Sequence, residues 1–368
     1  MKRRSALRIA LAAVVACLVA SAPAWGLTAT TWQGSDGGLW SESGNWTAGV
    51  PVDNTWQAKV NGFVGTIVVD TNVTIGKWTV SGNGMDMVLD LQGHTFNGGG
   101  TEWFRDIPDS AEAEVIDTVG GGTFIGGGAF YRNNASDADE EYGSVTFSDD
   151  VTLSSPNGFT FPSSTGQNWY AADARVVFQD QATFTTPKQF ELAGRAMVNA
   201  YATFTVTVKD EASFFVTSTS STPTWGLDGY AMFEVIGNAP TVDIDMARLT
   251  FGNGGVRVVI DDLAQDAALD FRRHLNLGTV DLDIDLADGV TPAQDQVFDV
   301  LLWGNGAADG TLTGTFVQDP EDVGVWEIIY NTDEKKVQAR YVPEPATLML
   351  LALCGPALLR AGKARRGK

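Results

Sequence analysis

Short runs of alternating apolar and polar residues fill the chain between residues 27 and 342, and helical periodicity is almost absent. Gly, Asn, Asp and Ser separate these runs, which are rich in β-branched and aromatic residues. Because side chains alternate between the two faces of a strand, the pattern predicts an all-β chain. The expected strands are Thr66–Val69, Val73–Ile75, Trp78–Val80, Met87–Leu91, Ser144–Phe147, Arg175–Phe178, Thr203–Val208, Met232–Ile236, Val242–Met246, Arg257–Ile260 and Thr279–Leu286.

Part of the chain repeats one pattern of strand, polar turn with an aspartate, and strand. The copies span residues 144–153, 175–184 and 205–214, with a weaker fourth copy at 231–240. The alignment makes Phe147, Phe178, Val208 and Val235 equivalent. Their spacing of roughly 30 residues is typical of solenoids, in which each unit buries its apolar face against its neighbours. The repeats therefore favour a parallel β-solenoid, with a β-sandwich as the alternative.

Several segments resemble parts of known bacterial proteins. The stretch Leu89-Asp-Leu-Gln-Gly-His-Thr95 resembles rungs of the right-handed parallel β-helices in surface proteins and autotransporter passengers. The Trp- and Gly-rich segment 31–51 resembles the opening of such proteins, and the aromatic series between Phe298 and Tyr330 resembles their terminal β segment. The resemblance implies a right-handed parallel β-helix with an N-terminal cap at 27–57, a body at 58–297 and a terminal segment at 298–342.

Residues 1–26 have the three parts of a secretory signal peptide. A basic start is followed by an apolar run from Ile9 to Ala20 and then by small residues, with cleavage expected after Ala24 or Gly26. The segment up to Cys17 loosely matches a lipoprotein cleavage box, but apolar residues continue beyond it. We therefore expect ordinary secretion.

Residues 343–368 begin with the triplet Pro343, Glu344 and Pro345. An apolar stretch and a basic tail follow, and this order at the extreme C-terminus resembles the PEP-CTERM sorting signal of Gram-negative bacteria. The apolar stretch is shorter than in most such signals. The resemblance implies transient membrane anchoring, processing near the triplet by an exosortase-type enzyme, and delivery to the cell surface or an extracellular polysaccharide matrix.

The charge is distributed unevenly along the chain. The 368 residues have a net charge of −21, but residues 27–342 hold 15 basic and 44 acidic groups, a net of −29. Such a surface repels phosphate backbones and anionic membranes, so nucleic acid is not an expected partner. The two cysteines, Cys17 and Cys354, both lie in the terminal segments. The body therefore has no thiol for a disulfide, a nucleophile or a metal site.

Four tryptophans lie close together near the N-terminus: Trp32, Trp40, Trp46 and Trp56. Exposed indole rings can stack on sugars, which makes these residues candidate glycan contacts. Tryptophan also buries a large apolar area, so the same cluster could close the open end of a solenoid core. We favour the cap and keep glycan contact as the alternative.

Aspartates alternate with aliphatic residues at 243–245 and 281–286, and a second acidic loop spans 137–143. Carboxylates on one strand face could bind Ca²⁺. At this net charge a solvated face is the simpler interpretation, so we predict no metal and no cofactor.

The sequence holds no pattern typical of a catalytic centre. The only histidines, His94 and His274, have no accompanying Ser or Asp signature, and no carboxylate pair can be selected among so many acidic residues. Threonine-rich strands such as 203–207 are irregular between repeats, which argues against an ice-binding face. We expect a non-enzymatic, exported structural or interaction protein of the surface or matrix. A glycan-binding module is the alternative, and a polysaccharide-cleaving enzyme is the least favoured hypothesis.

Overall fold

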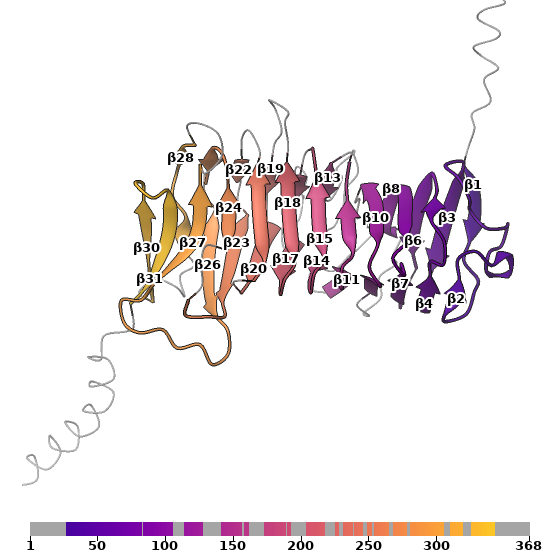
Figure 1. Ribbon diagram of the computed structural model, residues 1–368, viewed down its shortest axis with the longest axis horizontal. Coiled ribbons are helices and arrows are strands. Elements are labelled where there is room, and N and C mark those ends of the chain that lie inside the picture. Colours follow the sequence, from indigo (N-terminus) through magenta and orange to yellow (C-terminus); the bar gives the residue numbers. More distant parts are fainter. Residues whose placement is uncertain are drawn as a thin grey trace, which may run out of the picture.

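The computed structural model describes residues 27–342 except for a set of gaps: 83, 106–113, 128–140, 157, 162–172, 189, 193–203, 218–224, 228–230, 238, 246–248, 252–253, 265–267, 278–279, 305–309 and 319–324. The described chain forms a parallel β-solenoid whose strands stack along the long axis, with the N-terminal and C-terminal ends far apart (Figure 1). Parallel pairing between successive turns confirms the predicted solenoid and excludes the β-sandwich, whose sheets are antiparallel.

Sheet 1 has 14 strands and runs the whole length of the solenoid. Its strands, in order across the sheet, are β1 (Thr28–Thr31), β3 (Trp56–Asn61), β6 (Lys77–Ser81), β8 (Thr95–Arg105), β10 (Thr123–Gly127), β12 (Thr152–Ser154), β15 (Thr183–Thr186), β18 (Ser213–Thr217), β21 (Thr241–Asp245), β24 (Leu269–Phe271), β27 (Val297–Trp303), β31 (Lys336–Tyr341) and β30 (Trp326–Asn331), with β5 (Val73–Thr74) pairing beside β8. The last three strands pair antiparallel, unlike the rest of the sheet.

Sheet 2 has 11 strands and sheet 3 has six. Sheet 2 consists of β2 (Gly38–Leu39), β4 (Val64–Val68), β7 (Asp86–Asp90), β9 (Glu114–Val119), β11 (Glu141–Phe147), β14 (Asp173–Phe178), β17 (Phe204–Lys209), β20 (Ala231–Ile236), β23 (Gly255–Ile260), β26 (Asp281–Leu286) and β29 (Val317–Gln318). Sheet 3 consists of β13 (Phe159–Phe161), β16 (Phe190–Leu192), β19 (Trp225–Leu227), β22 (Leu249–Phe251), β25 (Leu275–Asn276) and β28 (Leu312–Thr313), and its labelled strands lie along the upper edge in Figure 1.

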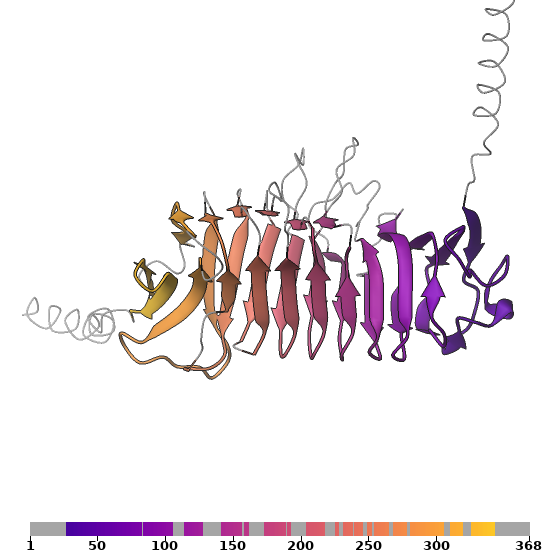
Figure 2. The same cartoon turned by 45° about the horizontal axis from the view of Figure 1, so that its top comes forward.

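Each full turn passes from sheet 2 through a short corner to sheet 1, and from there to sheet 3. Figure 2 shows the same regular stack from a second direction. The only helical element among the described residues is the short 3₁₀-helix Ser43–Asn45, so this part of the chain contains no helix long and apolar enough to cross a membrane.

The predicted register of the repeats is confirmed residue by residue. Phe147 pairs with Phe178, Phe178 with Val208, and Val208 with Val235, all in parallel. These side chains point inward and are buried, as the alternating pattern requires. The expected strands each overlap a strand of the structure. Hydrophobic periodicity therefore located both the strands and their stacking.

Aromatic side chains stack from turn to turn inside the solenoid. Phe96 and Phe124 lie with ring centroids 5.1 Å apart, and Phe184 and Phe214 lie 4.5 Å apart, both in stacked arrangements. Large buried rings supply much of the apolar area that holds neighbouring turns together. Some inward positions are polar. Thr186 is fully buried and its Oγ1 donates to the Ser155 carbonyl oxygen at 2.9 Å, whereas the buried hydroxyl of Thr118 has no hydrogen-bond partner among the described residues.

Candidate functional site

The corner between sheets 2 and 1 has the same backbone conformation on five successive turns. The inward residues Thr118, Phe147, Phe178, Val208 and Val235 pair with one another across sheet 2. On each turn, the residue two positions later has a positive φ: Gly120 (79°), Asp149 (56°), Asp180 (56°), Asp210 (58°) and Gly237 (83°). Glycine adopts this left-handed conformation freely, and Asp and Asn tolerate it better than most residues. Backbone geometry therefore explains the aspartate that marks the turn in the first three sequence repeats and the glycine in the fourth.

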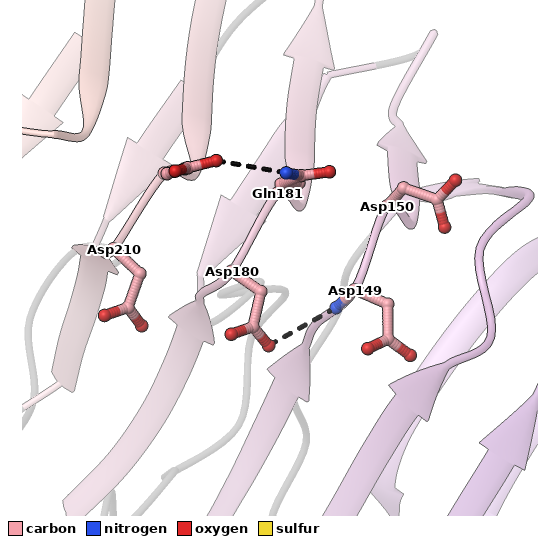
Figure 3. A pocket seen from close by; sticks show the side chains of 6 residues that line it. Asp149, Asp150, Asp180, Gln181 and Asp210 are labelled. Atoms are coloured by element: carbon pink, nitrogen blue, oxygen red, sulfur yellow. Dashed lines mark hydrogen bonds between the residues drawn. The ribbon is translucent and has the colours of Figure 1, made fainter.

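These corners form an acidic surface, which we call the acidic corner, with side chains in two rows (Figure 3). The rows line a hollow of about 560 Å³. Figure 3 shows Asp149, Asp180 and Asp210 in the first row and Asp150 and Gln181 in the second. Glu211, which follows Asp210 in the chain and is hydrogen-bonded to Gln181, continues the second row. Neighbouring members of a row are separated by one strand spacing, about 4.8 Å. All of these side chains except Gln181 are carboxylates.

Several side chains of the acidic corner cap the backbone or one another. Asp149 Oδ2 accepts a hydrogen bond from the backbone N–H of Gly120 at 2.8 Å, and Asp180 Oδ2 accepts one from the N–H of Asp149 at 3.4 Å. Gln181 Nε2 donates to Glu211 Oε2 at 3.0 Å. The corner thus links each turn to the next through side chains. Among the described residues, no His, Cys, Asp or Glu cluster is arranged to hold a metal ion.

The outer face of sheet 2 carries a network of ion pairs around a buried carboxylate. Glu234 faces outward from β20, yet its side chain is only 4% exposed. Its Oε2 accepts hydrogen bonds from Thr207 Oγ1 at 2.7 Å and Arg175 Nη2 at 3.2 Å, and its Oε1 accepts one from Arg257 Nη1 at 3.3 Å. Arg257 also binds Asp283 at 3.2 Å and Asp285. The network joins strands β14, β17, β20, β23 and β26 across the sheet.

The alternating aspartates singled out in the sequence are held by arginines. Asp243 pairs with Arg272, and Asp245 pairs with Arg273. Asp283 and Asp285 of the 281–286 run belong to the network around Arg257. Burial raises the pKa of Asp243, with Asp270 beside it on β24 adding to the effect and Arg272 opposing it. Of the acidic loop 137–143, residues 137–140 lie outside the described residues.

Burial also raises the pKa of Asp117 on the outer face of sheet 2, opposed by a hydrogen bond with Thr146 and assisted by the charge of Asp86. Because the pKa of Asp117 is higher in the folded than in the unfolded chain, the folded state loses stability as the pH rises from the ordinary Asp pKa of about 3.9 to the raised value. Asp117→Asn keeps an acceptor for Thr146 and removes the charge. It should therefore raise the melting temperature at pH 7 but not below about pH 3.5.

The control for this pH dependence is Asp53→Asn, which should have the opposite sign. Hydrogen bonds from the Thr55 hydroxyl and backbone lower the pKa of Asp53, so its contribution to stability is present at neutral pH and is lost as the pH falls. Melting curves of both variants and the unaltered chain between about pH 3 and pH 7 provide the measurement. A destabilised Asp117→Asn at neutral pH would contradict the expected sign.

The N-terminal tryptophans lie mostly inside the solenoid. Trp32, Trp40 and Trp46 are 6%, 1% and 3% exposed, and Trp56 is half-buried. The Trp40 and Trp46 rings meet edge to face with centroids 4.6 Å apart, and Trp46 Nε1 donates to the Trp40 carbonyl oxygen at 2.9 Å. This arrangement closes the end of the core and leaves little ring surface for stacking on sugars. It favours the cap over glycan contact.

The remaining sequence candidates have less defined surroundings. The backbone of His94 forms part of a corner, donating to the Leu91 carbonyl oxygen at 2.8 Å, and His274 Nδ1 lies 2.9 Å from Thr311 Oγ1. The sorting triplet Pro343, Glu344 and Pro345 lies outside the described residues.

One surface feature was not predicted from the sequence. Strand pairing aligns six hydroxyl residues on the outer face of sheet 1, one per turn, and we call this row the hydroxyl file. Its members are Thr95, Thr123, Thr152, Thr183, Ser213 and Thr241. Their spacing along the chain changes from turn to turn, so the sequence alone made the threonines look irregular. The alignment of the three repeats already places Thr152, Thr183 and Ser213 at one position, and strand pairing adds Thr95, Thr123 and Thr241.

Comparisons with known proteins add no relative. No family model, curated protein or solved structure matches the chain.

Proposed function

We propose that the protein is an exported, non-enzymatic structural or interaction protein of the cell surface or of an extracellular polysaccharide matrix. The observation that carries this proposal is the continuous solenoid, whose single core runs from the N-terminal tryptophans to Trp326. A solenoid of this kind presents long, repetitive surfaces to its surroundings. A net charge of −29 over residues 27–342 favours solubility and discourages contact with nucleic acid.

The proposed address rests on the two terminal segments. The signal-peptide pattern of residues 1–26 supports export, and the Pro343-Glu344-Pro345 triplet with its apolar and basic tail supports processing by an exosortase-type enzyme after transient membrane anchoring. The absence of cysteine from residues 27–342 fits an exported rod that is stabilised by its core and strand ladders.

Fractionation of a Gram-negative host that carries an exosortase-type enzyme tests the proposal. The full chain should reach the surface or matrix fraction without its tail. Replacing Pro343, Glu344 and Pro345 with alanine should leave the uncleaved protein in the membrane fraction. A matched variant, Thr347→Ala, keeps the triplet and should be sorted normally. Equal matrix recovery and equal cleavage of the triplet variant would overturn the proposed address.

A glycan-binding role is the second candidate, and the hydroxyl file is the observation that favours it. Sugar polymers are recognised through hydrogen bonds to hydroxyl groups and through contacts with ring faces, both of which an ordered polar surface can supply.

A further inference from the structure

The hydroxyl file is a regular, one-dimensional array. Its six members lie on consecutive parallel strands, so neighbouring hydroxyls are about 4.8 Å apart and the file spans about 24 Å along the solenoid axis. Five of the side chains are half-buried at the surface and Thr241 is exposed. Among the described residues, none of the six hydroxyls forms a hydrogen bond with another side chain or with the backbone.

The next row of outward side chains on sheet 1 does not repeat in the same way. It contains, in the same order, Asn97, Ile125, Ser154, Thr185, Phe215 and Asp243. Residues of one chemical type therefore repeat along the solenoid axis, but not from one row to the next across the sheet. A crystalline surface such as ice requires matching positions in two directions, whereas an extended polymer requires them in one. The array fits a polymer that lies along the axis.

The charges beside the file restrict the kind of polymer. The second row of the acidic corner, Asp150, Gln181 and Glu211, lies two residues before Thr152, Thr183 and Ser213 in the chain. Neither the file nor the acidic corner contains a lysine or an arginine. Lys209, at the end of β17, lies 4.0 Å from Asp210 and is the one cation paired with the acidic corner among the described residues. A polymer of uronate or sulfate groups would therefore meet a predominantly negative border. A polymer of uncharged sugars would not be repelled, because carboxylates accept hydrogen bonds from its hydroxyl groups.

Phe215 adds an apolar contact at the same place. It is half-buried on the outer face of β18 and lies two residues after Ser213 of the file. An aromatic face beside hydrogen-bonding groups suits a sugar ring, which has an apolar face and a polar edge.

We propose that the hydroxyl file binds one extended chain of an uncharged polysaccharide, lying parallel to the solenoid axis. The file supplies hydrogen bonds on successive turns, and Phe215 stacks on a ring near its C-terminal end. The inference deepens the proposed function, because it names the matrix component that the solenoid contacts. The inference depends on the proposed function only in assuming that the protein meets the polysaccharide at the cell surface or in the matrix.

Three isosteric substitutions test the site: Thr123→Val, Thr152→Val and Thr183→Val in one variant. Valine keeps the shape and strand propensity of threonine but removes the hydroxyl. The matched control removes three outward hydroxyls from sheets 2 and 3, with Thr66→Val, Thr205→Val and Thr313→Val. Circular dichroism and melting curves establish that both variants fold. The probes are cellulose, curdlan and dextran as uncharged polymers and alginate as a uronate, in co-sedimentation or affinity electrophoresis.

The unaltered chain should bind at least one uncharged probe and not alginate. The file variant should lose about tenfold or more of that affinity, and the control variant should retain it. Binding to no uncharged probe, binding to alginate alone, or equal binding by the file variant would overturn the inference. So would inhibition of ice recrystallisation that depends on the file while uncharged polymers do not bind. Because sorting is measured separately by fractionation, a missorted chain that still binds polymer would refute the proposed address alone.

Discussion

Replacing Arg175 and Arg257 together with methionine should lower the free energy of unfolding by about 3 kcal/mol. Both guanidinium groups bind Glu234, whose side chain is 4% exposed. Without them, the hydrogen bond from Thr207 at 2.7 Å is the one that remains to the carboxylate from the described part of the chain. A buried charge stripped of its partners is far more costly than the intact pair is favourable. Methionine retains much of the apolar stem of arginine, so the loss reports mainly on charge.

The decisive comparison adds Glu234→Gln to the double substitution. Glutamine removes the unpaired charge and can still accept from Thr207, so the triple variant should recover most of the lost stability. Arg273→Met is the matched control: its partner Asp245 is 31% exposed, and the loss of such a surface pair should cost less than about 1 kcal/mol. Urea unfolding followed by circular dichroism supplies the values. A triple variant as unstable as the double variant would show that packing, rather than charge, explains the loss.

The ion pairs around Glu234 could not be predicted from the sequence. Arg175 and Glu234 are far apart in the chain, and they meet because successive turns place β14 and β20 on one sheet. The periodic apolar residues predicted the stacking of β11, β14, β17 and β20, since inward burial tolerates no slip of register. Outward side chains form no comparable periodic pattern in the sequence. Which of them lie side by side can be predicted only when the number of residues in each turn is known.

Turn length also explains why the surface arrays were harder to predict than the core. Loops of different lengths follow sheet 3, so the spacing between equivalent residues shortens along sheet 2, from the pair Phe147 and Phe178 to the pair Val235 and Val258. The acidic corner remained recognisable, because the left-handed positions favour Asp or Gly next to a strand end. The hydroxyl file has no comparable backbone requirement. The repeat alignment places only Thr152, Thr183 and Ser213 at one position, and pairing of the strands extends the row to Thr95, Thr123 and Thr241.

The N-terminal tryptophans illustrate a different ambiguity. Clustered tryptophan is compatible with a stacking surface and with a buried cap, and composition does not distinguish the two. The backbone resolves the choice, since the segment after β1 folds back over the first strand. Thr47 N donates to the Thr31 carbonyl oxygen at 3.0 Å, and Ala48 N donates to Thr30 Oγ1 at 3.1 Å. This return covers the exposed edge of sheet 1 and encloses Trp46.

Gly122→Ala should destabilise the solenoid by about 3 kcal/mol, whereas Gly289→Ala should cost about 1 kcal/mol. The two glycines have nearly equal φ values, +89° and +88°, so a new Cβ brings the same conformational strain at each. They differ in their surroundings. A Cβ on Gly122 would lie 2.4 Å from the His94 carbonyl oxygen, while a Cβ on Gly289 would have nothing within 4 Å. The difference between the variants therefore isolates the close approach of successive turns.

The clash at Gly122 cannot be relieved by moving a side chain, because the nearest atoms are backbone atoms of Gly93 and His94. Moving the corner would strain the ladder on both sides: the Thr123 N–H donates to the His94 carbonyl oxygen at 3.0 Å, and the Thr152 N–H donates to the Gly122 carbonyl oxygen at 2.9 Å. Urea unfolding measures the two losses, and amide hydrogen exchange should show faster exchange at Thr123 and Thr152 in Gly122→Ala alone. Equal destabilisation by the two alanines would mean that backbone strain, and not the spacing of the turns, requires glycine at this corner.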